Sequence, residues 1–90
     1  MKLFLIHLGF YDAELGIYEM HINKMVAAPD ARSAKEQIKK SKLFIDKKMH
    51  VDGIEEISVI DGYKVTLEKA STAEINQTVT FGYDAVKALS

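Results

Sequence analysis

A chain of 90 residues, 48% hydrophobic and 28% charged, has the composition of one globular domain, which excludes an intrinsically disordered segment. The net charge of −1 provides no general attraction to nucleic acid or anionic membranes, and no apolar run approaches the roughly 18 residues of a membrane span. The absence of cysteine excludes disulfide scaffolds, thiolate zinc sites and cysteine nucleophiles. We therefore expect one cytoplasmic domain over residues 1–90, with a core at 2–68 and a weakly patterned extension at 69–90.

Two strands are predicted at the start of the chain. Residues 2–9 are almost wholly apolar, which favours a buried strand. A turn is expected at 11–16, and residues 18–26 then alternate between apolar and polar side chains, as a second strand does. The two strands are expected to form an antiparallel hairpin.

The pairing of these strands follows from matching their faces. Residues that lie opposite each other in an antiparallel pair point to the same side of the sheet. If Gly9 pairs with Ile17, His7 lies opposite Glu19, with His21 as a diagonal neighbour on the same face. The other face is then the core face, with Phe4, Ile6, Leu8, Tyr18, Met20 and Ile22.

One main helix is predicted at residues 31–41. Asp30 is expected to be its N-cap, because an aspartate carboxylate can accept a backbone hydrogen bond from the first helical turn. A narrow stripe of small and apolar residues would lie on the sheet: Ala31, Ala34 and Ile38. Residues 42–53 are less clearly patterned, and we expect a short helical extension followed by a loop.

A second hairpin is predicted around Asp61-Gly62, where alternating apolar residues lie on both sides of a turn signal. Matching of the apolar faces favours a three-residue loop over 60–62, with Val59 opposite Tyr63. Such a loop requires a positive φ at Gly62. Residues 83–89 could form two helical turns in the extension.

Together these elements predict an α+β fold. We expect an antiparallel sheet of two β-hairpins in the order ββαββ, with the main helix packed on one face and a C-terminal extension. One helix cannot cover both faces of such a sheet. The second face, with Leu3, Leu5 and Met25 between polar groups, is therefore expected to contact the C-terminal extension or a second copy of the chain, which predicts a homodimer.

An ordered set of short motifs resembles a known family. The motifs are Leu8-Gly9-Phe10-Tyr11, Gly16-Ile17-Tyr18-Glu19-Met20-His21, Met49-His50-Val51-Asp52-Gly53 and Asp61-Gly62-Tyr63-Lys64-Val65. They are similar to the DUF1543 family of small bacterial proteins, which contain one or two copies of a domain of unknown function. The resemblance covers roughly residues 2–68. It implies a bacterial cytoplasmic origin and no particular activity.

One group of polar residues is a candidate metal or catalytic site. His7, Glu19 and His21 are expected on one face of the sheet, and His50 and Asp52 approach from the loop before the third strand. Two histidines and a carboxylate are a minimal ligand set for zinc or non-haem iron, and a His-Glu pair suits general base catalysis. A histidine opposite a glutamate is also a common cross-strand polar pair. Both interpretations remain open at this point.

A second candidate is a basic surface on the helix. Four lysines could contact phosphates, namely Lys35, Lys39, Lys40 and Lys42, and Phe44 or Tyr11 could stack on a base. The negative net charge and the absence of a recognised nucleic-acid motif argue against this role.

Two classes of function follow from these observations. The default is a non-catalytic binding or protein-interaction module that self-associates, with no cofactor. The alternative is a small metal-dependent or acid-base enzyme that uses His7, Glu19 and His21. No small-molecule ligand can be named from the sequence.

Overall fold

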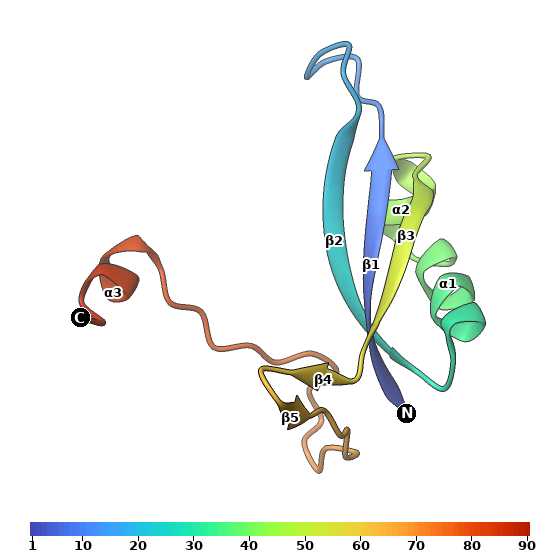
Figure 1. Ribbon diagram of the computed structural model, residues 1–90. Helices are drawn as coiled ribbons and strands as arrows, with labels where there is room; N and C mark the ends of the chain where they lie inside the picture. Colours follow the sequence, from blue (N-terminus) through green and yellow to red (C-terminus); the bar gives the residue numbers. More distant parts are fainter.

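Three antiparallel strands and two short helices form the main body of the protein (Figure 1). The structure is a computed structural model that describes residues 1–90, and it confirms the α+β class. Its elements, in chain order, are β1 (Lys2–Phe10), β2 (Met20–Ala28), α1 (Ala31–Lys39), α2 (Lys42–Asp46), β3 (His50–Ile57), β4 (Val59–Ile60), β5 (Tyr63–Lys64) and α3 (Tyr83–Lys87). The chain contains no helix with the length and hydropathy to cross a membrane.

The strands form two separate sheets. The larger has the order β2-β1-β3, and the smaller pairs β4 with β5. The predicted helix and the short helical extension are present as α1 and α2. The predicted loop up to residue 53 is shorter than expected, since β3 begins at His50 and takes its hydrogen bonds from β1.

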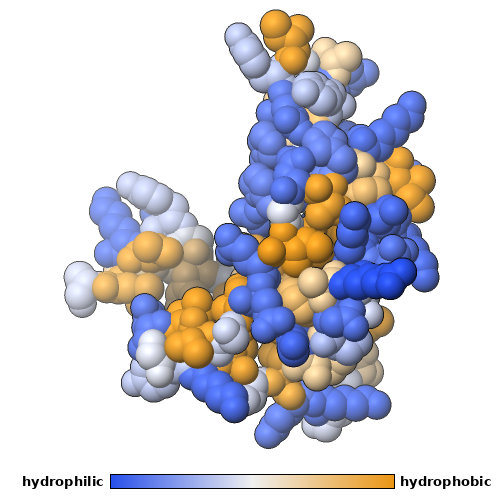
Figure 2. All heavy atoms as spheres, turned by 45° about the vertical axis from the view of Figure 1, so that its right-hand side comes forward, coloured by the Kyte–Doolittle hydropathy of each residue, from blue (hydrophilic) through white to orange (hydrophobic).

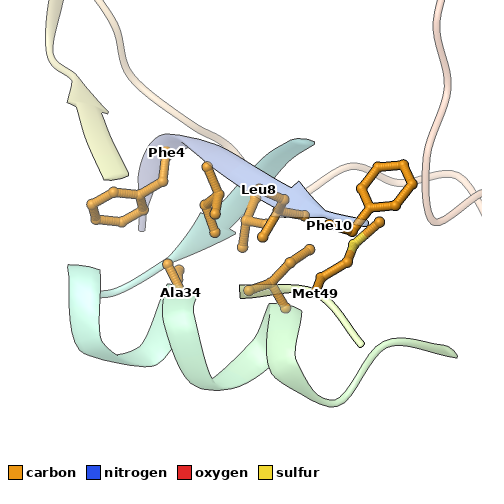
Figure 3. Close-up of a cluster of buried hydrophobic side chains, with 9 residues drawn as sticks. Phe4, Leu8, Phe10, Ala34 and Met49 are labelled. Carbon is orange, nitrogen blue, oxygen red and sulfur yellow. The ribbon is translucent and has the colours of Figure 1, made fainter. Parts of the chain in front are cut away.

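The core lies between β1 and α1. Figure 3 shows Phe4 and Leu8 of β1 on the side of the sheet where Ala34 of α1 lies. The buried residues are Phe4, Ile6, Leu8, Phe10, Val26, Ala28, Ala34, Ile38 and Met49. The predicted inward face of β1 is thus confirmed. The prediction for Tyr18 is wrong, because this residue precedes β2 and its side chain is 79% exposed.

The pairing of β1 with β2 differs from the predicted one. Gly9 lies opposite His21, and His7 lies opposite Asn23, so the predicted pairs with Ile17 and Glu19 are wrong. The connection between the strands is longer than a tight turn and runs through residues 11–19. The difference is four residues, an even number, and for this reason the residues that lie within β1 and β2 remain on their predicted faces.

Strand β3 contains a bulge beside β1. His7 pairs with Gly53 and Leu8 pairs with Val51, so Asp52 is an extra residue with no partner. The extra residue changes the alternation of β3, and both Val51 and Ile54 pack against the core. Bulges of this kind re-aim side chains and often lie beside functional sites.

The second hairpin has a tighter turn than predicted. Val59 pairs with Lys64 and Ile60 pairs with Tyr63, which leaves Asp61 and Gly62 as a two-residue loop. Both loop residues have positive φ, 52° and 82°, as a type I′ turn requires. The positive φ of Gly62 is confirmed, and the three-residue loop is wrong. The apolar side chains of this hairpin are exposed, so no buried face selects its register.

Asp30 caps α1 as predicted, and this cap makes stability depend on pH. Its Oδ1 accepts a hydrogen bond of 2.7 Å from the backbone N–H of Ser33, and this bond lowers the pKa of Asp30 below 3.8. Because the pKa of Asp30 is lower in the folded state, its carboxylate stabilises the protein at every pH above its pKa in the unfolded chain. This stabilisation is lost as the pH falls through the pKa of Asp30 in the folded protein. We expect Asp30→Ala to lower the melting temperature at neutral pH and to have little effect at about pH 2.

Thermal unfolding followed by circular dichroism at both pH values measures this difference. Asp30→Asn is the control, because asparagine is also a good N-cap but carries no charge. If Asp30→Ala lowered the melting temperature equally at both pH values, the carboxylate would not be the source of the effect.

Candidate metal centre

Five ionisable side chains gather around Gly9 on the face of the sheet opposite α1. We call them the polar cluster: His7 of β1, Glu19 before β2, His21 of β2, and His50 and Asp52 of β3. All five were singled out from the sequence, and the structure brings them together. His50 and Asp52 come from strand β3 itself, because this strand pairs with β1 at Gly9.

The two carboxylates of the polar cluster each join the same two histidines. His21 Nε2 lies 3.3 Å from Asp52 Oδ2 and 3.6 Å from Glu19 Oε2. His50 Nε2 lies 3.2 Å from Asp52 Oδ1 and also contacts Glu19 Oε1. Each carboxylate therefore directs one oxygen to His21 and the other to His50.

The charges of the polar cluster favour a bound cation. The side chains of Glu19 and Asp52 are only 27% and 29% exposed, and neither forms an ion pair with a lysine or arginine. The lysines that form ion pairs do so elsewhere: Lys2, Lys42 and Lys47. When the histidines are neutral, two partly buried negative charges lie close together, and a cation between them would relieve their repulsion.

His7 is held in place by a residue that the sequence analysis did not identify. Its Nδ1 lies 2.7 Å from Oδ1 of Asn23, and its ring stacks on that of His21 with 5.0 Å between the ring centroids. Because a carboxamide oxygen only accepts hydrogen bonds, Nδ1 of His7 is the donor in this contact. A hydrogen bond of this type commonly orients a metal-binding histidine. Asn23 could have been found from the sequence, because it lies two residues after His21 and therefore on the same face of the second strand.

Gly9 lies directly beneath the side chains of the polar cluster. A Cβ atom at this position would lie 2.5 Å from Asp52 Oδ2 and 2.7 Å from His50 Nε2, and closer still to Glu19 Oε1. The three side chains can therefore converge only because residue 9 has no side chain. An isolated glycine inside a strand often marks a close approach of this kind, and this signal was present in the sequence.

The ligand atoms of the polar cluster lie close enough together to hold a metal ion. Two sets of three ligand atoms lie within 4.8 Å of one another: His7, His21 and Asp52, and Glu19, His50 and Asp52. Zinc bonds of 2.0–2.1 Å place neighbouring tetrahedral ligands roughly 3.3 Å apart, close to the 3.2, 3.3 and 3.6 Å found here. The contact between His50 Nε2 and Glu19 Oε1 is shorter and is a direct hydrogen bond.

Three other residues singled out from the sequence lie outside the polar cluster. Lys35 and Lys39 are exposed on α1, which covers the opposite face of the sheet. Tyr11 is exposed in the connection between β1 and β2 and lines a hollow with Lys47 and Lys48. The structure therefore does not join the basic helix and this aromatic residue into one surface.

An ion pair ties the connection before Glu19 to the end of α2. Lys47 Nζ lies 3.2 Å from Asp12 Oδ2, and the hydrogen bond from Lys47 lowers the pKa of Asp12 below its ordinary value. The contact anchors the β1–β2 connection, which leads to Glu19, against the body of the protein.

Comparison with known proteins identifies a family and no function. The family model described as Domain of Unknown Function (DUF1543) matches residues 16–67, a segment that includes four members of the polar cluster: Glu19, His21, His50 and Asp52. No curated protein and no solved structure matches the chain. Because the match extends over more than half of the sequence, this protein belongs to the DUF1543 family.

Proposed function

We propose that the polar cluster binds a divalent transition-metal ion of the zinc class, and that the function of the domain depends on this ion. One observation carries the proposal: two sets of three ligand atoms, from His7, His21 and Asp52 and from Glu19, His50 and Asp52, each lie within 4.8 Å of one another. Imidazole and carboxylate ligands without thiolate suit zinc, iron and neighbouring metals.

The position of the cluster supports a reactive role for the ion. Structural zinc sites are closed by four protein ligands, whereas catalytic sites use three and keep a position for water or substrate. Each ligand set here has three members, and the cluster lies on a sheet face that no helix covers. An ion held in this way can activate water or polarise a substrate carbonyl or phosphoryl group. The cluster thus favours a metal-dependent activity over a purely non-catalytic module.

Titration of the metal-free protein with zinc in a calorimeter tests the proposal. We expect zinc to bind and magnesium not to bind at the same concentration, because magnesium prefers oxygen ligands. Asp52 belongs to both ligand sets, so Asp52→Asn should weaken zinc binding by at least about 10- to 100-fold, the range seen when a group that only supports a ligand is lost.

Asp46→Asn is the matched control, since Asp46 lies on α2 and pairs with Lys42. It should bind zinc as the unchanged protein does. Equal zinc affinity of the Asp52→Asn and Asp46→Asn variants, or no heat of zinc binding to the unchanged protein, would contradict the proposal.

We also propose that the protein works in the reducing cytoplasm of a bacterial cell. The lack of cysteines supports this location, as does the resemblance of its motifs to small bacterial proteins. A cluster of histidines and carboxylates would hold its metal there without any thiolate ligand.

A further inference from the structure

The protein exposes far more surface than a compact chain of its mass. Its accessible surface is 7767 Å² and its radius of gyration is 15.8 Å. A compact monomer of 10.1 kDa is expected to expose about 5,300 Å² and to have a radius of gyration of about 12 Å. The excess of about 2,500 Å² per chain is the area that a partner could cover.

The excess surface belongs to the last third of the chain, residues 58–90, which we call the C-terminal arm. Figure 1 shows it leaving the end of β3 and running away from the sheet through β4, β5 and α3. Every residue of the arm except Val65 is exposed. On the sheet face opposite α1 the arm borders Ala27 through Leu67 but leaves Met25 68% exposed.

The arm is rich in large apolar side chains. Figure 2 shows hydrophobic surface gathered on it. Its exposed members are Val59, Ile60, Tyr63, Leu67, Ile75, Val79, Phe81, Tyr83, Val86 and Leu89. Ordering a segment of this length costs conformational entropy, and a single chain does not offset that cost by burying these side chains. The arm therefore needs an apolar surface on which to pack.

The body of the protein offers such a surface at the edge of its sheet. A groove of about 470 Å³ lies between β2 and α1, and its apolar lining includes Leu8, Val26, Ile38 and Leu43. Ile75 of the arm reaches the rim of this groove but is 94% exposed, so it does not fill it. Strand β2 pairs only with β1, and its outer edge has backbone groups free for another strand.

We propose that the C-terminal arm packs on the β2–α1 groove of a second copy of this chain and so forms an arm-exchanged homodimer. Each chain has both surfaces, an apolar arm and an apolar groove, and two copies can satisfy both by one reciprocal exchange. Burial of about 2,500 Å² per chain would total about 5,000 Å², within the range of obligate homodimers. A net charge of −1 adds little repulsion between the copies.

Light scattering coupled to size exclusion at micromolar concentration tests the association. The unchanged protein should have a mass of about 20 kDa, twice the 10.1 kDa of one chain. The double variant Ile75→Asp with Phe81→Asp should dissociate at least ~100-fold more readily, because buried apolar anchors contribute most of the affinity of an interface. Leu15→Asp, a change at an exposed leucine outside the arm, should leave the mass unchanged.

The absence of cysteine allows a direct test of the exchange. A chain with Leu43→Cys and Ile75→Cys places one thiol in the groove and one on the arm. After oxidation, a disulfide between chains shows as a band of about 20 kDa on a non-reducing gel, twice the mass of one chain. A disulfide only within one chain would overturn the exchange.

A mass of 10 kDa for the unchanged protein, or a dimer that survives the double variant, would overturn the proposal. Circular dichroism verifies that each variant is folded.

Discussion

Gly9→Ala is expected to remove zinc binding and leave the fold intact. The new methyl group would meet the ends of Glu19, His50 and Asp52, all flexible side chains that can rotate away without moving the backbone. Their rotation separates the ligands of the polar cluster. Because three ligands move at once, the loss of zinc affinity should exceed that of any single outer contact, at more than about 100-fold.

Calorimetric titration with zinc and a thermal unfolding curve measure the two halves of this prediction. Gly53→Ala is the matched control, since a Cβ atom at Gly53 comes no closer than 3.9 Å to His7. It should bind zinc normally. If Gly9→Ala kept its zinc affinity, the polar cluster would not be the metal centre; if it unfolded, Gly9 would be needed for the backbone and not for the cluster.

Phe4→Ala is expected to have the largest effect on stability. Phe4 is completely buried between β1 and α1, among the largest fully buried side chains of a small core. Removing a buried phenylalanine destabilises a protein by about 3–5 kcal/mol through lost burial and the cavity left behind. The total free energy of unfolding of such domains is about 5–15 kcal/mol, so the variant should be close to unfolding.

Urea denaturation followed by circular dichroism gives the free energy of unfolding of each variant. Tyr18→Ala is the control, because Tyr18 is an aromatic residue that the face pattern also placed inward but the structure leaves exposed. Its loss should change stability by no more than ~0.5 kcal/mol. Similar destabilisation by both variants would mean that Tyr18 is packed in the folded protein after all.

The separation of faces could be predicted from the sequence, whereas the register could not. Alternation of apolar and polar residues is a local property, and it correctly placed Phe4 and Ile6 inward and His7 outward. Register depends on where the connecting turn begins, and the 11–19 connection carries no strong two-residue turn signal. The predicted pairing was therefore displaced by four residues, with His7 opposite Asn23 and not Glu19.

The register of the second hairpin could not be predicted from the sequence either. The apolar residues around Asp61-Gly62 were assumed to share a buried face, which favoured a three-residue loop. In the structure Val59, Ile60 and Tyr63 beside the turn are exposed, so local turn preference decides, and Asp-Gly adopts a two-residue turn with both φ values positive. Pattern matching requires a buried face, and this hairpin has none within a single chain.

The sequence by itself determined the strands, the capped helix α1 and the choice of His7, Glu19, His21, His50 and Asp52 as candidate ligands, because periodicity, caps and side-chain chemistry are local properties. Only the tertiary structure decided that β3 pairs with β1 at Gly9 and bulges at Asp52. That pairing joins segments about forty residues apart through backbone hydrogen bonds and a shared core, which no local pattern encodes. It alone brings the two carboxylates between the same two histidines.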